Sequence, residues 1–211
     1  MTPETPAFPE LWLARHGETE WTQMRQHTGT TDIPLTERGR AQARALEPSF
    51  EGIDFDLVLS SPMQRAEETA RLVGLDPVPD ERLMEWNYGE YEGRTTADIQ
   101  RERPGWDLWR DGCPGGEQAE DVARRLEPLL DELRADGERR VVLFGHAHCF
   151  RVLAGSWLEL GGMAGRALTL GTASLSVMAT EHGRPVIAHW NAVPLERAPT
   201  PATTLDATRH R

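Results

Sequence analysis

Two histidines and two arginines of this chain each stand just after a short apolar run. Arg15 and His16 follow LWLA, His146 follows RVVLFG, and Arg65 lies a few residues beyond DLVLSS. Ligands of open α/β sheets bind beyond the carboxyl ends of the strands, in the loops that follow them. If the three runs are neighbouring parallel strands, we expect the four side chains to line one strongly basic pocket.

Such a pocket suits phosphoryl transfer, because a phosphoryl group presents three equatorial oxygens while a nucleophile attacks in line. Arginine guanidinium groups bind these oxygens in a forked geometry. A neutral imidazole can be the nucleophile, and two neighbouring guanidinium groups lower the pKa of His16 by like-charge repulsion. Gly17 lets the backbone approach closely. Attack by His16 forms a phosphohistidine, and the departing alkoxide then needs a proton from a nearby acid, for which a carboxyl group is the candidate.

The overall charge narrows the possible partners. The 211-residue chain has 23 Lys and Arg against 34 Asp and Glu, a net charge of −11, and such a surface repels nucleic acids and anionic membranes. We therefore expect a small phosphorylated metabolite as the ligand, no nucleic acid and no membrane, and a monomer or homodimer. Two cysteines and an N-terminus without a basic and apolar leader favour a reducing, cytoplasmic location.

Five β-rich runs predict strands, at residues 11–15, 56–61, 140–146, 173–179 and 185–190. Helical patterns lie between the first four of these runs, which is the order of an α/β fold. We expect a three-layer α/β/α sandwich with a mostly parallel central sheet. It should form a single domain over residues 11–191, with a cap-like segment at about 86–118 and flexible ends at 1–10 and 192–211.

Four helices are predicted from capping and periodicity. Thr36 is the expected N-cap of one helix, and Ser61 and Pro62 are the expected cap and first position of the next. The third covers the periodic apolar positions from Ala119 to Leu133, and Pro128 should bend it or divide it in two. The fourth follows His146, where apolar residues repeat at helical spacing: Phe150, Leu153, Trp157 and Leu160.

The segment LWLARHGETEW resembles the signature of the histidine phosphatase superfamily, also called the phosphoglycerate mutase-like family. The likeness continues in family order through Thr28-Gly29, SSPMQRAEET, LMEWNYGEYEG and FGHAHCFRVL, over about residues 11 to 190. Four motifs in order are far more specific than the RHG tripeptide alone. The chain is therefore identified as resembling this family, which implies the phosphoglycerate mutase-like fold.

The resemblance also implies roles for individual residues. His16 becomes the phosphorylated nucleophile, Glu85 becomes the proton donor, and Arg15, Arg65 and His146 bind the phosphate; no metal or other cofactor is implied. Chemistry adds a constraint, since Glu85 must be protonated when the alkoxide leaves and ionised when it activates water in the second step.

Within this family the sequence favours a phosphatase over a cofactor-dependent phosphoglycerate mutase. Mutases of the family carry a long insertion between the acid and the second histidine, whereas only 60 residues separate Glu85 from His146. Two positions also depart from the mutase pattern, which tends to have Asn where Thr22 and His148 stand.

A closer likeness is to the sedoheptulose-1,7-bisphosphatase-like branch, through QHTGTTDIPLT, MEWNYGEYEG, WDLWRDGCPGGE and GHAHCFRVLAGSWLEL. This likeness implies a sugar phosphate or bisphosphate as substrate. Ala147 departs from the His-Gly-His common in that branch and adds a methyl group near the pocket. The further candidates for substrate contacts are Thr22, Arg25, Gln26, His27, Thr28, Gly29, Tyr88, Arg110, Ala147 and His148.

Two other classes of function remain open. If His146 and His148 were two apart on a strand, both imidazoles could bind one metal ion, as in a metal-dependent hydrolase. The chain could also be a non-catalytic module that binds a phosphorylated metabolite, although it keeps both His16 and Glu85. The remaining residues with reactive or aromatic side chains have simpler explanations: Cys113 and Cys149 as inert thiols, and Trp86, Trp106 and Trp109 as core residues or sugar contacts.

Overall fold

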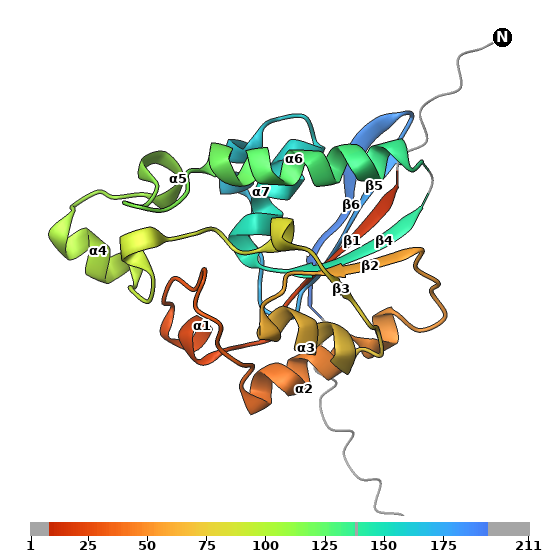
Figure 1. Cartoon of the computed structure of the whole chain (residues 1–211), viewed down its shortest axis with the longest axis horizontal. Coiled ribbons are helices and arrows are strands. Elements are labelled where there is room, and N and C mark those ends of the chain that lie inside the picture. The colour runs from red at the N-terminus through yellow and green to blue at the C-terminus, as the bar shows by residue number, and fades with distance from the viewer. Residues whose placement is uncertain (1–8, 138, 194–211) are drawn as a thin grey trace, which may run out of the picture.

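The computed structural model describes residues 9–137 and 139–193, and these form a six-stranded mixed sheet with helices on both sides (Figure 1). The strand order is β3-β2-β4-β1-β5-β6. The pairs β3–β2, β2–β4 and β4–β1 are parallel, and β1–β5 and β5–β6 are antiparallel. The strands span Glu10–Arg15 (β1), Leu57–Ser60 (β2), Val78–Pro79 (β3), Arg140–Gly145 (β4), Leu175–Glu181 (β5) and Arg184–Ala192 (β6). The predicted three-layer α/β/α architecture is therefore confirmed.

The central strand β4 is buried on both faces, because its side chains point alternately to opposite sides of the sheet. Val141 and Leu143 belong to the cluster that includes the apolar faces of α6 (Ala119–Ala135) and α7 (Ala147–Trp157). Val142 and Phe144 belong to a second cluster, on the side of α2 (Glu37–Ala45) and α3 (Gln64–Leu72). Both faces of the sheet are thus covered, which holds β1, β2 and β4 in one register.

Of the two N-caps predicted from the sequence, the structure confirms one. Thr36 is the N-cap of α2, and its hydroxyl accepts a hydrogen bond from the N–H of Gly39. The cap predicted at Ser61 is wrong, because α3 begins at Gln64 after Met63. The Ser61 hydroxyl is instead within 2.8 Å of Nε2 of His146, so the β2–α3 loop serves the site rather than the helix start.

Two boundaries of the other helices differ from expectation: Pro128 does not divide α6, and α7 ends earlier than the apolar spacing suggested. Helix α6 runs as one element through Pro128, and its buried leucines on both sides of the proline pack into the core. Helix α7 ends at Trp157, so Leu160 lies beyond it with 68% of its surface exposed. The apolar spacing continued past the true end of the helix, and periodicity alone cannot locate that end.

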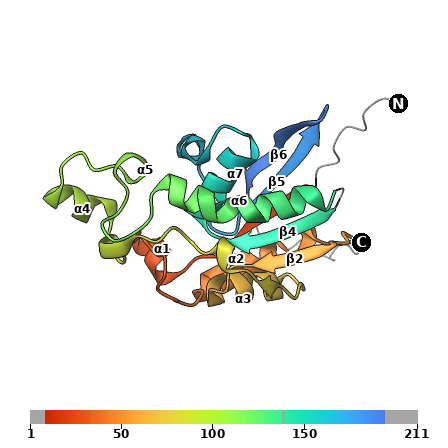
Figure 2. The same cartoon turned by 45° about the horizontal axis from the view of Figure 1, so that its top comes forward.

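A group of short elements extends beyond the carboxyl ends of the parallel strands, clearly visible in Figures 1 and 2. It contains α1 (Glu20–Met24), α4 (Thr96–Glu102) and α5 (Leu108–Asp111). Residues 86–118, the predicted cap-like segment, supply α4 and α5. The 3₁₀ helices are Glu47–Ser49, Glu81–Leu83, Gly89–Tyr91 and Gly162–Ala167.

The ends of the predicted domain lie close to the ends of the sheet. Strand β1 already includes Glu10, and β6 extends to Ala192. The flexible ends expected from the sequence fall almost entirely on residues 1–8 and 194–211, outside the described residues. Within the described ranges, no helix is both long and apolar enough to cross a membrane.

Candidate active site

His16 follows β1 directly, and hydrogen bonds hold its backbone on both sides. Its N–H donates to the carbonyl of Gly145 and its carbonyl accepts from the N–H of Ala173. Ring nitrogen Nδ1 lies 2.7 Å from the carbonyl oxygen of Gly17, and only a protonated Nδ1 can donate there. This contact selects the tautomer in which Nε2 keeps a free lone pair. Nε2 is therefore the nitrogen that can act as a nucleophile.

Gly17 is required by a close approach of two backbones, as the sequence suggested. A Cβ atom at this position would lie 2.3 Å from the carbonyl oxygen of Gly39. The N–H of Gly17 donates to the hydroxyl of Thr69 on α3. The turn after β1 is thus packed against α2 and α3, which fixes the direction of the His16 ring.

Arg65, on α3, is fully buried. Its guanidinium group donates to the carbonyl oxygens of Thr31 and Gly29 at 3.0 and 3.1 Å. Nε lies 3.3 Å from Nδ1 of His146, which must accept because Arg cannot. The guanidinium group is therefore held between the loop after α1 and the second histidine.

His146 caps the N-terminus of α7 and is fully buried. With Nδ1 accepting from Arg65, Nε2 carries the proton and donates to the Ser61 hydroxyl at 2.8 Å. Its ring centroid lies 5.2 Å from that of His16. The predicted convergence of His16, Arg65 and His146 is thus present in the structure.

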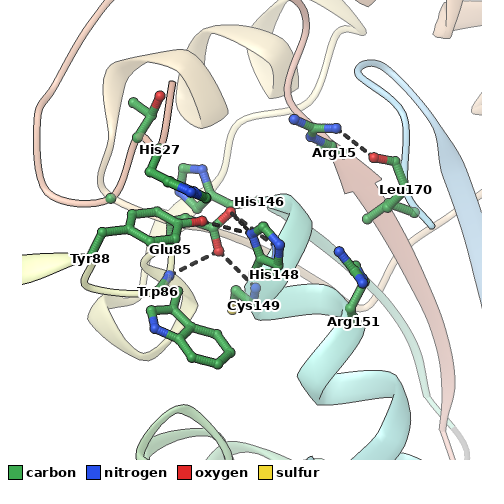
Figure 3. Close-up of polar contacts among 12 residues, drawn as sticks. Arg15, His27, Glu85, Trp86, Tyr88, His146, His148, Cys149, Arg151 and Leu170 are labelled. Carbon is green, nitrogen blue, oxygen red and sulfur yellow. Dashed lines mark hydrogen bonds and ion pairs between the residues drawn. The ribbon is translucent and has the colours of Figure 1, made fainter. Parts of the chain in front are cut away.

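Arg15 lies at the end of β1 and one of its terminal nitrogens donates to the carbonyl of Leu170 (Figure 3). Its Nε is buried and has no hydrogen-bond partner among the described residues. A buried donor without a partner is costly, and an anionic ligand oxygen is the group that best satisfies it. Arg15 therefore has capacity left for a phosphate.

Glu85 is 6% exposed, and three backbone N–H groups donate to its carboxylate (Figure 3). Oε1 accepts from Trp86 and Cys149 at 2.9 and 2.8 Å, and Oε2 accepts from His148 at 3.1 Å. Two of these donors belong to the first turn of α7, where the helix dipole favours a negative group. Oε2 has the fewer partners, so it is the oxygen that can exchange a proton with a ligand.

Electrostatics keeps the two catalytic-site imidazoles uncharged. Burial, followed by the charges of Arg65 and Arg15, holds the pKa of His16 well below its usual 6.5. The pKa of His146 is lowered in the same way, by burial first and then by Arg65. The sequence predicted the direction for His16 from the guanidinium groups alone, whereas removal from water is the larger cause.

We expect the free energy of unfolding to fall as the pH drops from about 7 to about 5. In the unfolded chain His16 and His146 take up protons near pH 6.5, whereas in the folded chain their lowered pKa values keep them neutral. This stabilisation is complete above pH 6.5 and is lost as the pH falls toward the folded-state values. Each group contributes up to about 1.4 kcal/mol per pH unit in that interval. Urea unfolding across the interval measures it.

A His16→Gln variant provides the comparison for this titration. It removes one of the four histidines whose pKa is lowered in the folded chain, His16, His27, His146 and His148, so its unfolding free energy should depend less steeply on pH than that of the wild type. Equal slopes for the two proteins would show that His16 is not buried in its neutral form.

A cavity of about 200 Å³ lies over His16. Arg15, His16 and Glu85 line it together with most of the predicted substrate contacts: Thr22, Arg25, Gln26, His27, Thr28, Tyr88, Ala147 and His148. Arg65 and His146 stand behind this wall with none of their surface exposed. The loop after α1, the segment around Tyr88 and the start of α7 therefore meet at one place.

Besides Arg65 and His146, which were expected to line the pocket but are buried behind it, two further predicted substrate contacts do not line this cavity. Arg110 lies on α5, and its guanidinium group is paired with Asp111 and the carbonyl of Gly105. Gly29 uses its N–H on the carboxylate of Glu92 and its carbonyl on Arg65. The spacing of residues in the sequence could not show that Arg110 pairs with the adjacent Asp111 on α5.

His146 and His148 do not have the strand geometry that a metal pair at i and i+2 would need. His146 precedes α7, while His148 lies in its first turn with Nδ1 2.7 Å from the Tyr88 hydroxyl. In the ranges 9–137 and 139–193, no three His, Cys, Asp or Glu side chains are grouped to hold a metal ion. This pair of histidines therefore gives no structural support to the alternative of a metal-dependent hydrolase.

Sequence reasoning missed several residues that hold the site in place. Glu92 accepts hydrogen bonds from the N–H groups of Gly29 and Thr31, which orients the carbonyls that bind Arg65. Ser61 and Thr69 accept from His146 and Gly17. All three residues lie within quoted motifs. Nothing in their spacing indicates these contacts, which for Glu92 reach backbone groups more than 60 residues away.

The aromatic and thiol residues take the simpler of their predicted roles. Trp86, Trp106 and Trp109 are buried in the core. Burial raises the pKa of Cys113 and of Cys149 to about 12, so both remain thiols at neutral pH.

Comparison with known proteins identifies the family. The model of the histidine phosphatase superfamily (branch 1) matches residues 11–193. An acid phosphatase of Mycobacterium tuberculosis is 36% identical over 177 residues, covering 82% of this chain and 87% of that protein. The sedoheptulose 1,7-bisphosphatase of Saccharomyces cerevisiae is 34% identical over 188 residues, covering 72% and 69%.

Solved structures and further relatives agree. A mycobacterial glucosyl-3-phosphoglycerate phosphatase, solved with VO3, superposes with a TM-score of 0.78 at 33% identity, covering 87% of this chain and 98% of that one. A probable phosphoglycerate mutase GpmB of Enterobacter sp. is 31% identical, with 79% and 83% covered. With the matched family model and the site geometry, these findings show that the chain belongs to the histidine phosphatase superfamily.

Proposed function

We propose that this protein hydrolyses small phosphomonoesters through a phosphohistidine on His16, without a metal ion. One observation carries the proposal: the Nδ1 contact of His16 with Gly17 leaves Nε2 unprotonated on a residue that lines a cavity with Arg15 and feels the charges of Arg65 and Arg15. A neutral imidazole is a nucleophile, and the fixed positive charges of the arginines stabilise the phosphoryl oxygens as charge develops.

The reaction proceeds in two steps. Nε2 of His16 attacks phosphorus, the bond to the ester oxygen breaks, and Oε2 of Glu85 gives its proton to the departing alkoxide. In the second step the ionised Glu85 takes a proton from water, the hydroxide attacks phosphorus, and the N–P bond breaks. Inorganic phosphate leaves, and His16 returns to its neutral form with Glu85 protonated again.

A hydroxylated substrate, such as a sugar phosphate or bisphosphate, fits the cavity wall. Oε1 of Gln26 is buried without a hydrogen-bond partner among the described residues, while Nε2 of the same amide donates to the carbonyl of Gly93. The bond to Gly93 assigns the orientation of the amide. The free oxygen is an acceptor for a substrate hydroxyl, and a related yeast protein is named for a sugar bisphosphate.

A phosphoglycerate mutase is the second candidate, because relatives at 31% identity carry that name. A mutase must keep water from the phosphoenzyme while the bound molecule reorients to receive the phosphoryl group at another position. Between Glu85 and α6 the chain forms only short helices, namely α4, α5 and the 3₁₀ helix Gly89–Tyr91. This favours release of the phosphoryl group to water.

A substrate screen tests the proposal. Sugar phosphates, phosphoglycerates and p-nitrophenyl phosphate are incubated with the protein, with and without a chelator, and inorganic phosphate and phosphoglycerate isomers are both measured. We expect release of phosphate that the chelator leaves unchanged. Loss of activity in the chelator would contradict the metal-free mechanism, and isomerisation without release of phosphate would identify a mutase.

A further inference from the structure

Arg25 is an arginine at a backbone position that normally belongs to glycine. Helix α1 ends with Arg25 at φ 57° and ψ 33°, in the left-handed region. The N–H of Arg25 donates to Thr22 and the N–H of Gln26 donates to Trp21, the two bonds that close a Schellman motif. Glycine is usual there because a side chain strains this conformation.

The strained conformation cannot relax, because the loop after α1 is tied down. Gln26 forms a bridge with Thr95, and the amide of its side chain donates to the carbonyl of Gly93. The backbone of His27 exchanges two hydrogen bonds with Gly93 and Arg94. The fold therefore holds Arg25 in a costly conformation that glycine would adopt freely, and such outliers gather at ligand sites.

The side chain of Arg25 is exposed and has no ion-pair or hydrogen-bond partner among the described residues. It lines the same cavity as Arg15 and His16. Most arginines of this acidic chain are paired with a carboxylate, as Arg110 is with Asp111. An unpaired guanidinium group at the wall of a ligand cavity can bind an anion that is not the reacting phosphate.

We infer that Arg25 binds a second anionic group, phosphate or carboxylate, on the same small substrate whose first phosphate reacts at His16. This inference rests on the proposed function and names a substrate class: phosphomonoesters with two anionic groups. Two of the related proteins are named for substrates of this kind, a sugar 1,7-bisphosphate and a glucosyl-3-phosphoglycerate.

Two matched pairs of substrates test the inference. One pair tests phosphate as the second anionic group, and the other tests carboxylate. Fructose 1,6-bisphosphate is compared with fructose 1-phosphate, and 3-phosphoglycerate with glycerol 3-phosphate. Within each pair the second compound keeps the phosphate but has a hydroxyl in place of the other anion. We expect the wild type to prefer the doubly anionic member of at least one pair, by about tenfold in kcat/KM, the usual effect of one charge-assisted hydrogen bond.

Arg25→Gly is the decisive variant, because glycine suits the left-handed position and the melting temperature should be no lower than that of the wild type. The preference for the second anion should fall by about tenfold. The loss should appear in KM rather than in kcat, since the second anion is bound equally in the ground state and the transition state. Arg25→Lys should retain part of the preference.

Arg110→Gln is the matched control, since Arg110 is an exposed arginine outside the cavity that was also among the candidate substrate contacts. It should keep the wild-type preference. An unchanged preference in Arg25→Gly, or no preference in the wild type, would overturn the inference while leaving the phosphatase proposal intact.

Binding measurements test the role of Arg25 without catalytic turnover. Calorimetry of the four compounds with a His16→Ala variant, with and without Arg25→Gly, should show tighter binding of the doubly anionic compounds only when Arg25 is present. Equal affinities in the two proteins would overturn the inference. If the wild type hydrolysed none of the four compounds, the phosphatase proposal would fail for them, and the binding ratio would still decide the role of Arg25.

Discussion

Replacement of His16 by alanine should lower kcat/KM for phosphomonoesters by at least about 10³-fold, because the reaction loses its nucleophile. The residual rate would come from the arginines and from binding alone. His146 cannot replace the lost nitrogen, because its Nδ1 accepts from Arg65 and its Nε2 is engaged with Ser61. His148 also lines the cavity, but its Nδ1 is engaged with the Tyr88 hydroxyl. Initial rates with p-nitrophenyl phosphate and with the best substrate of the screen measure the effect.

His189→Ala is the matched control for this substitution. His189 is an exposed histidine of β6, on the strand at the edge of the sheet. This variant should keep the wild-type rate. A His16→Ala variant that was folded by circular dichroism and turned over at the wild-type rate would remove His16 from the mechanism.

The second large effect is expected from Glu85→Gln. The amide has the shape of the carboxyl group, so its oxygen can still accept from the N–H groups of Trp86 and Cys149. It can neither protonate the alkoxide nor take a proton from water. We expect kcat for alkyl phosphates such as sugar phosphates to fall by about 10²–10⁴-fold. Stopped assays of phosphate release measure this change.

The same variant should respond differently to a good leaving group. The p-nitrophenolate ion departs without a proton, so the first step is spared, while water in the second step still lacks its base. We therefore expect a burst of p-nitrophenol of about one equivalent per enzyme, followed by slow turnover. Glu90→Gln, an exposed carboxylate nearby in the same segment, should behave as the wild type. Equal losses for alkyl and aryl phosphates would contradict the role of Glu85 as an acid.

Much of the fold follows from local patterns in the sequence. The runs at β1, β2 and β4 are continuous and apolar because both faces of these strands are covered, and each is followed by a chemically active residue. Parallel pairing then brings His16, Arg65 and His146 together without any further information. Strand β3 was not predicted, because Val78 and Pro79 are too short a run to show a period.

The finer features of the site depend on contacts that no local pattern encodes. The orientation of Arg65 is set by carbonyls of a loop more than 30 residues earlier in the chain, and these are oriented in turn by Glu92. The left-handed conformation of Arg25 breaks the local preference for glycine, so propensity pointed away from it. The cap at Ser61 was wrong for the opposite reason, since its local sequence suggested a helix start that the structure places at Gln64. Arg110 was a candidate through the resemblance, and the structure pairs it with Asp111 outside the cavity.

The proposed mechanism requires that the ring of His16 carries the phosphoryl group during turnover. The most direct test is to mix Glu85→Gln with p-nitrophenyl phosphate, quench the reaction in base after the burst, and locate the phosphate by peptide mass spectrometry. The account predicts close to one phosphate per chain, on His16. A burst without any phosphorylated peptide, or a phosphate on another residue, would contradict it.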